Sequence, residues 1–169
     1  VNASTGFIGT SSATVGRLLK TTDYGATWVN VTGYTATGTT RGIYFVDADT
    51  GYVSNSNYAI WKTTNGGTSF TELGDFGTGT IYEVKFFNAS TGVASGANGE
   101  ILVTTNHGVN WTSSNIGHRS NQFGLGLEGF LGSRSVQNLD GGGSNTIFAA
   151  GVAGVITKST DLGATWTPV

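Results

Sequence analysis

Short runs of β-branched and aromatic residues alternate with turn segments rich in Gly, Asn, Asp and Ser. Two consecutive groups of four such runs lie at 43–46, 51–54, 59–63 and 69–73, and then at 82–86, 91–95, 100–104 and 110–112. Runs of this length and composition, bounded by turn residues, are typical of β-strands. The pattern therefore predicts two units of four short antiparallel strands.

The two flanking regions carry incomplete or lengthened versions of the same unit. At the start, residues 2–6 read like residues 88–92, the turn that follows a first strand, so the first unit begins after its first strand. Its remaining strands are predicted at 7–10, 17–21 and 27–31. In the last unit, strands are predicted at 146–150 and 155–158, after a segment longer than its counterparts.

An eight-residue pattern, Ser/Thr-x-Asp/Asn-x-Gly-x-x-aromatic, recurs once in each unit. Its defining residues are Thr21, Asp23, Gly25 and Trp28; Thr63, Asn65, Gly67 and Phe70; Thr104, Asn106, Gly108 and Trp111; Ser159, Asp161, Gly163 and Trp166. Self-similarity at a period near 40 residues is typical of repeat architectures. A four-stranded unit of that size matches one blade of a propeller.

Each residue type in the motif suits the turn between a third and a fourth strand. Asp or Asn accepts backbone N–H groups two residues on, and Gly supplies a positive φ at no steric cost. The first Ser or Thr can hydrogen-bond across the turn. The terminal aromatic residue restarts the strand and contributes apolar area between sheets. We therefore expect all four copies to be structural turns and not ligand or metal sites.

The four copies resemble the Asp-box, or BNR, repeats of β-propellers. That family includes sialidases, xyloglucanases, sortilin-type receptor ectodomains and a photosystem II assembly factor, and the resemblance implies that the Asp box lies on a turn away from the ligand site. The copies depart from the family pattern at Ser69-Phe70 and at Asn110. The expected fold is all-β, a β-propeller-type array of four-stranded antiparallel blades, the first of four lacking its innermost strand.

We expect a single repeat domain over residues 1–169. The blades are predicted at about 1–33, 41–74, 80–116 and 128–169, with an insertion at about 118–145. Because the chain opens on Val1 and the first blade is incomplete, we expect an excerpt or a processed part of a longer chain. Two alternatives stay open: a strand supplied by another chain, or an open stack of sheets that would form a filament.

Composition excludes several classes of partner and cofactor. Only 11% of residues are charged and the net charge is −2, so no basic patch indicates nucleic acid. No apolar run approaches the ~20 residues of a membrane-spanning helix. Cysteine is absent, and the two histidines, His107 and His118, do not lie at metal-ligand spacing. The Gly-x-Gly-x-x-Gly at 124–129 lacks a following helix, so we expect no cofactor.

An enzyme of this family would need charged groups that the sequence does not bring together. Sialidases hold a substrate carboxylate with three arginines, and the four here (Arg17, Arg41, Arg119 and Arg134) do not occupy equivalent positions in their units. Glycoside hydrolysis needs two carboxylates across one cleft. Asp47 and Asp49 share a turn, where aspartates usually act as caps. We expect no enzymatic activity, with glycoside hydrolase the only enzyme class left open.

Two features suggest where partners or modifications could lie. Apolar residues gather in the long segment of the last unit, at Phe123, Leu125, Leu127, Phe130 and Leu131. This segment is either an elongated first strand followed by a Gly-rich turn at 140–144, or a surface that packs on a neighbouring chain. Asn-x-Ser/Thr sequons at Asn2, Asn30 and Asn88 are candidate glycosylation sites, and Asn110 is the poorest acceptor.

The function that fits these observations is a non-catalytic, secreted scaffold, extracellular or on the cell surface. It would serve protein–protein contact, adhesion or multimeric assembly, including filaments, with other chains or the remainder of its own chain as partners. The first alternative is carbohydrate binding, with glycans stacked on aromatic residues such as Tyr24, Tyr34, Tyr58 and Trp61, although the position of Trp61 in a third strand favours packing between sheets. The second is a part of a glycoside hydrolase.

Overall fold

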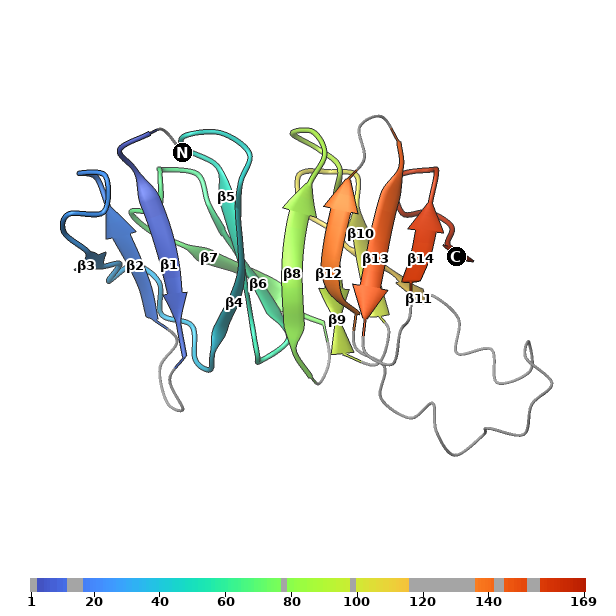
Figure 1. The fold of residues 1–169 in the computed structure, drawn as a ribbon. Helices are drawn as coiled ribbons and strands as arrows, with labels where there is room; N and C mark the ends of the chain where they lie inside the picture. The colour runs from blue at the N-terminus through green and yellow to red at the C-terminus, as the bar shows by residue number, and fades with distance from the viewer. Residues whose placement is uncertain are drawn as a thin grey trace.

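The computed structural model describes residues 3–11, 17–76, 79–97, 100–115, 136–141, 145–151 and 156–169. These residues form four antiparallel sheets and no α-helix (Figure 1). The first sheet holds β1 (Gly6–Thr10), β2 (Arg17–Thr21) and β3 (Val29–Asn30). The second holds β4 (Thr40–Phe45), β5 (Gly51–Asn55), β6 (Ala59–Thr63) and β7 (Thr71–Asp75). The predicted all-β class is confirmed.

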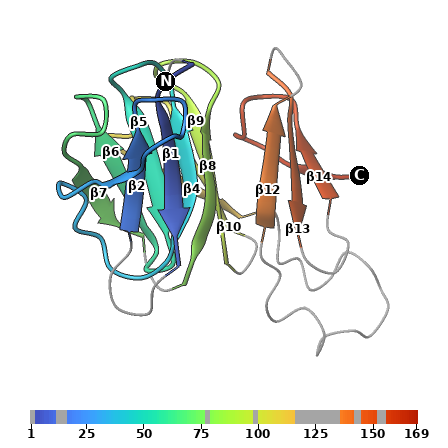
Figure 2. The ribbon, with the colours of Figure 1, turned by 60° about the vertical axis from the view of Figure 1, so that its left-hand side comes forward.

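The third and fourth sheets complete the row. The third holds β8 (Ile81–Phe86), β9 (Gly92–Gly96), β10 (Glu100–Thr104) and β11 (Thr112–Asn115). The fourth holds β12 (Val136–Gly141), β13 (Ile147–Gly151), β14 (Ile156–Ser159) and β15 (Thr167–Pro168). Each sheet is a simple meander, and β4, β8 and β12 follow one another through the row (Figures 1 and 2). Among the residues described, no helix is long and apolar enough to cross a membrane.

The strand registers show that the first sheet has three strands where its neighbours have four. Gly6 pairs with Thr21 in the first sheet as Gly51 pairs with Thr63 in the second. β1 therefore corresponds to the second strand of each later sheet, β5, β9 and β13. Within the described residues, the first sheet has no counterpart of β4, β8 and β12, in agreement with the prediction from the sequence.

Strand limits agree with the sequence pattern best in the middle of each sheet. β2, β6 and β10 have the predicted limits, whereas the outermost strands start later than predicted, because the turn motif still holds the backbone up to the aromatic residue. β12 lies inside the range expected for the insertion, so part of that range is a first strand. The apolar residues at 123–131 lie outside the described residues. The Gly-rich turn expected at 140–144 begins later than predicted, because residues 140 and 141 still belong to β12, and residues 142–144 lie outside the described residues.

The hydrophobic core is divided among the junctions between neighbouring sheets. Leu18 and Val53 pack between the first and second sheets, and Tyr52 packs with Phe86 between the second and third. A third cluster around Val93 joins the third and fourth sheets. Aromatic pairs reinforce two of these junctions: Phe7 stacks on Phe45 with centroids 4.5 Å apart, and Tyr52 on Phe86 at 3.9 Å. Each sheet is thus stabilised by its neighbours.

Candidate functional site

The hydroxyl group that opens each motif copy joins the two ends of its turn. Thr63 Oγ1 accepts the N–H of Gly67 at 2.9 Å and that of Asn65 at 3.3 Å, and it donates to Asn65 Oδ1 at 3.0 Å. The same three contacts occur in the other copies, at Thr21, Thr104 and Ser159. All four side chains are buried. The hydroxyl is an internal part of the turn.

The Asp or Asn side chain accepts hydrogen bonds further along the turn than the sequence predicts. Instead of the N–H two residues on, Asp23 Oδ1 accepts the N–H of Thr27, four residues on, at 2.9 Å. Asn65 Oδ1 likewise accepts the N–H groups of Thr68 and Ser69, at 3.1 and 3.0 Å. The expected Asx-turn bond is therefore wrong, because the N–H two residues on already donates to the motif hydroxyl.

These bonds keep the two motif carboxylates ionised. The Thr27 hydroxyl, then its N–H, and then the Thr21 hydroxyl lower the pKa of Asp23 to about 2, from an ordinary value of 3.8. The pKa of Asp161 is lowered to about 2 by the equivalent donors of Thr165 and Ser159. Both oxygens of each carboxylate accept bonds from within the turn. Neither carboxylate is poised to exchange a proton at neutral pH.

Each turn contains two successive residues with positive φ. The motif glycines take this conformation: Gly25, Gly67, Gly108 and Gly163 have φ of 87°, 78°, 76° and 88°. The residues before them do so too: Tyr24, Gly66, His107 and Leu162 have φ of 61°, 65°, 60° and 57°. Three of these are not glycine, which is uncommon in this region. These positions could not be predicted from the sequence, since their side chains share no property.

The positive-φ residues connect the motif to a second turn of the same sheet. The N–H of Gly66 donates to the carbonyl of Asp49 at 2.9 Å, and that of His107 to the carbonyl of Ser90 at 2.9 Å. Tyr24 and Leu162 make the equivalent bonds to Ser4 and Asn145, at 3.1 Å each. The accepting carbonyls lie in the turn that leads into the second strand. The motif therefore ties together two loops at one end of every sheet.

The same turns also contact the preceding sheet. Lys20 Nζ donates to the carbonyl of Gly66 at 2.6 Å, and Lys62 Nζ donates to the carbonyl of His107 at 2.8 Å. The Tyr52 hydroxyl reaches that second carbonyl as well, at 2.8 Å. The motif is thus a structural joint both within a sheet and between sheets.

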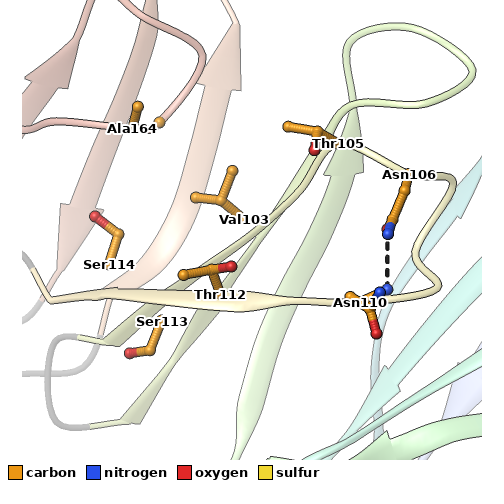
Figure 3. Close-up of a pocket in the computed structure, with 9 residues that line it drawn as sticks. Val103, Thr105, Asn106, Asn110, Thr112, Ser113, Ser114 and Ala164 are labelled. Atoms are coloured by element: carbon orange, nitrogen blue, oxygen red, sulfur yellow. Dashed lines mark hydrogen bonds between the residues drawn. The ribbon is translucent and has the colours of Figure 1, made fainter.

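A pocket of about 420 Å³ lies where the third sheet faces the fourth motif copy (Figure 3). It is lined by Val103, Thr105, Asn106, Asn110, Thr112, Ser113, Ser114, Gly163 and Ala164. Figure 3 shows Ala164 across the opening from Val103 and Thr112. None of these lining residues is ionisable, so they offer hydrogen bonds to a neutral polar ligand and no group for proton transfer.

Two charged side chains considered for catalysis, those of Asp47 and Arg41, make structural contacts. Asp47 Oδ1 accepts the N–H of Asp49 at 2.8 Å and of Thr50 at 2.6 Å, and these bonds, that of Thr50 first, lower the pKa of Asp47. Asp47 is therefore the cap of its turn. The guanidinium of Arg41 lies 5.9 Å from the ring centroid of Tyr82. In the described part of the chain, no cluster of His, Asp or Glu side chains could hold a metal ion.

Two of the four aromatic residues considered for sugar stacking are buried. Tyr24 is 80% exposed, but Tyr34 and Tyr58 are buried at 4% and 3% exposure. Trp61 is half-buried and contacts Tyr34 edge to face, with centroids 5.5 Å apart. The expectation of an exposed aromatic platform is wrong for Tyr34 and Tyr58, because connecting segments fold back onto the neighbouring sheet, whereas the expected packing of Trp61 between sheets is confirmed.

Two of the candidate glycosylation sites lie on the described surface. The side chain of Asn88 is exposed, although its Oδ1 accepts the N–H groups of Ser90 and Thr91 at 2.9 and 2.7 Å. Asn30 is exposed in β3. Asn2 lies outside the described residues.

Solved structures similar to this chain are β-propellers. A GH74 enzyme from Niastella koreensis matches with a TM-score of 0.74 and 19% identity, over 99% of this chain and 28% of that one. The GH74 xyloglucanase from Xanthomonas campestris matches with a TM-score of 0.71 and 10% identity, over 99% and 29%. YCF48 bound to D1 peptide matches with a TM-score of 0.63 and 19% identity, over 99% and 58%.

These similarities establish the fold and leave the activity open. The chain spans between 28% and 58% of the length of the three structures. No protein-family model matches the sequence, and no curated protein matches it. The four-sheet array is therefore similar to part of a β-propeller.

Proposed function

We propose that this chain is an Asp-box, or BNR, repeat domain that acts as a non-catalytic scaffold, extracellular or on the cell surface, for protein–protein contact, adhesion or multimeric assembly. The observation that carries the proposal is the bonding of the motif. Its hydroxyl and its Asp or Asn side chain are bonded within the turn in all four copies, as at Thr63 and Asn65. The motif residues stabilise the array of sheets, and partners would bind on surfaces outside the motif turns.

Protein contact is supported by one of the similar structures. YCF48, whose fold matches 99% of this chain, was solved with a bound D1 peptide. A row of small sheets presents long, rigid surfaces, and such arrays commonly bind extended partners. The resemblance in fold makes a peptide segment of another protein a reasonable ligand class for this chain.

The proposal is tested by a peptide array. Fluorescently labelled chain is incubated with immobilised 15-residue peptides of varied sequence, and a matched sample unfolded in urea and then diluted serves as the control. We expect saturable binding to a subset of peptides by the folded chain alone. Equal binding by both samples, or none by the folded chain, would contradict a role in protein contact. Protease treatment of intact producing cells tests the surface location.

A second candidate function, carbohydrate binding, is favoured by the pocket in Figure 3. Its hydroxyl and amide side chains, among them Asn110 and Ser114, suit a neutral polyhydroxylated ligand. Glycan-array binding that is lost in Asn110→Ala and retained in the exposed control Thr64→Ala would support it. For the remaining alternative, glycoside hydrolysis, cleavage of xyloglucan that is abolished by Asp47→Asn would be required.

A further inference from the structure

Exposed large apolar side chains gather on the two outer sheets of the row. Of those in the described residues, Ile8, Tyr24, Trp28 and Val29 belong to the first sheet and its motif turn, Phe148, Ile156 and Val169 to the fourth sheet, and Val109 to the third motif copy. Figure 1 shows the first and fourth sheets at opposite ends of the row. Exposed apolar patches of this kind mark interaction surfaces.

The exposed positions of the fourth sheet are buried wherever another sheet follows. Ile156 is 49% exposed, whereas its counterparts in the three earlier sheets, Leu18, Ile60 and Ile101, are 0% exposed. Phe148 is 39% exposed. Its counterparts in the second and third sheets, Tyr52 and Val93, are 0% exposed. Among the described residues, the fourth sheet thus presents a junction face that no further sheet covers.

The first sheet shows the complementary face. Ile8 is 44% exposed, whereas its counterparts Val53, Ala94 and Ala149, each covered by the preceding sheet, are 0% exposed. Trp28 is 37% exposed, and the equivalent Phe70 of the second sheet is 8% exposed. The first sheet therefore presents the receiving side of a junction.

The fourth sheet contains a lysine–aromatic pair that also occurs at the junctions within the row. Lys158 Nζ lies 5.7 Å from the ring centroid of Phe148. The same pairing occurs twice within the row, in Lys20 with Phe7 at 5.5 Å and in Lys62 with Tyr52 at 5.4 Å. In both of those pairs the ammonium donates to a carbonyl in the motif turn of the next sheet. No described residue accepts a hydrogen bond from the ammonium group of Lys158.

The first sheet, at the other end of the row, carries a carbonyl group that could accept this hydrogen bond. Tyr24 occupies the position of Gly66 and His107, whose carbonyls receive the lysines, and shares their positive φ. The glycine that follows each acceptor also has a partner. A Cβ on Gly67 would lie 2.6 Å from the Phe7 ring of the preceding sheet, but one on Gly25 would meet only Trp28 of its own turn, at 3.6 Å.

We propose that the fourth sheet of one copy of this chain docks against the first sheet of a second copy. In this contact Lys158 donates to the carbonyl of Tyr24, the ring of Phe148 covers Gly25, and Ile156 and Ile8 become buried. The inference rests on the proposed scaffold function and names its partner. The contact is head-to-tail, so successive copies close into a ring or continue as a filament.

The described part of the first sheet indicates how tightly two copies should bind. It has no counterpart of the strands that bring Phe45 and Phe86 onto the aromatic ring of the preceding sheet. A junction between copies therefore reproduces the turn contacts and lacks the stacked ring. Interfaces of limited area and partial complementarity bind with dissociation constants on the order of micromolar. We expect reversible association that depends on concentration.

Sedimentation velocity of the folded chain over a range from about 1 to 300 μM tests the inference. We expect the average mass to rise with concentration above the 17.4 kDa of one copy. Phe148→Glu blocks one end and Ile8→Glu the other, and each should weaken association at least about tenfold, as burial of an unpaired charge at the centre of an interface does. Val109→Glu is the matched control, because Val109 is 65% exposed and belongs to neither face.

Mixing the two blocked variants identifies the head-to-tail geometry. Phe148→Glu keeps the first-sheet end intact and Ile8→Glu keeps the fourth-sheet end intact, so an equimolar mixture should form dimers that neither variant forms alone. Lys158→Glu provides a second fourth-sheet variant. A wild-type chain that stays monomeric, an equal effect of Val109→Glu, or a mixture that stays monomeric would each overturn the proposal. Peptide binding retained by such a monomer would leave the proposed function standing.

Discussion

Replacing Thr63 by valine removes the hydroxyl that closes the second motif turn and keeps the shape of the side chain. Thr63 is 1% exposed, and its Oγ1 accepts the N–H of the buried Gly67 at 2.9 Å. An unsatisfied buried N–H costs about 1–3 kcal/mol, and the lost bonds to Asn65 add to it. We therefore expect the free energy of unfolding to fall by about 2–3 kcal/mol, which lowers the Tm by roughly 4–12 °C in a chain of this size.

Two further substitutions isolate the role of the hydroxyl in a thermal unfolding assay followed by tryptophan fluorescence. Thr63→Ser keeps the hydroxyl, as Ser159 does in the fourth copy, and loses one methyl group, worth about 0.8 kcal/mol. Thr64→Val changes an exposed neighbour and should alter stability by about 0.5 kcal/mol at most. If Thr63→Val proved no more destabilising than Thr63→Ser, the hydroxyl would not stabilise the turn.

Three other predictions concern the loss of stability at acidic pH, the replacement of two motif glycines, and the removal of a lysine that joins two sheets. Because the pKa of Asp23 and of Asp161 is lowered from 3.8 to about 2, the stability that the two carboxylates contribute is present above pH 3.8 and is lost as the pH falls through about 2. In the double Asp→Asn variant, the fall of Tm with acidification over this pH range should be smaller than in the wild type. An unchanged fall of Tm would contradict the assignment. Gly25→Ala should lower the free energy of unfolding by about 1 kcal/mol, from positive φ alone. Gly67→Ala should lower it by at least about 2 kcal/mol, because the added Cβ also meets the Phe7 ring at 2.6 Å. Equal midpoints of urea unfolding for the two variants would contradict the contact between Gly67 and Phe7. Lys62→Met should cost about 1 kcal/mol by removing a charged donor from the second junction, and wild-type stability would show that the bond contributes nothing.

The sequence predicts the central strands well because turn chemistry bounds them on both sides. β6, for example, ends at Thr63, where the motif begins, and starts after the Asn-rich segment at 55–57. The outermost strands start later than predicted, because the first residues of each predicted run have strand-like side chains but are held by the turn. Local pattern cannot separate these two states, since hydrogen bonds four residues apart decide between them.

Exposure of the aromatic residues could not be read from the sequence. Tyr34 and Tyr58 lie in connecting segments, where an exposed ring is the ordinary expectation. In the structure the segment after β3 crosses to the second sheet, where Gly33 bridges to Ser69 and Tyr34 packs on Phe70. Burial of these rings depends on the neighbouring sheet, which no local pattern describes. The same dependence leaves Ile8 and Phe148 exposed, although their residue types resemble those of buried counterparts.

The repeated motif joins the strands and sheets and is not itself a chemical site. Amide hydrogen exchange at Gly25, Gly67, Gly108 and Gly163 tests this role most directly. All four N–H groups lie in turns at the ends of the sheets, three of them at buried glycines, and each donates to a motif hydroxyl, at 2.8–3.0 Å. We expect all four to exchange slowly, with protection close to that of the adjoining strands. Exchange at the rate of open loops would contradict it.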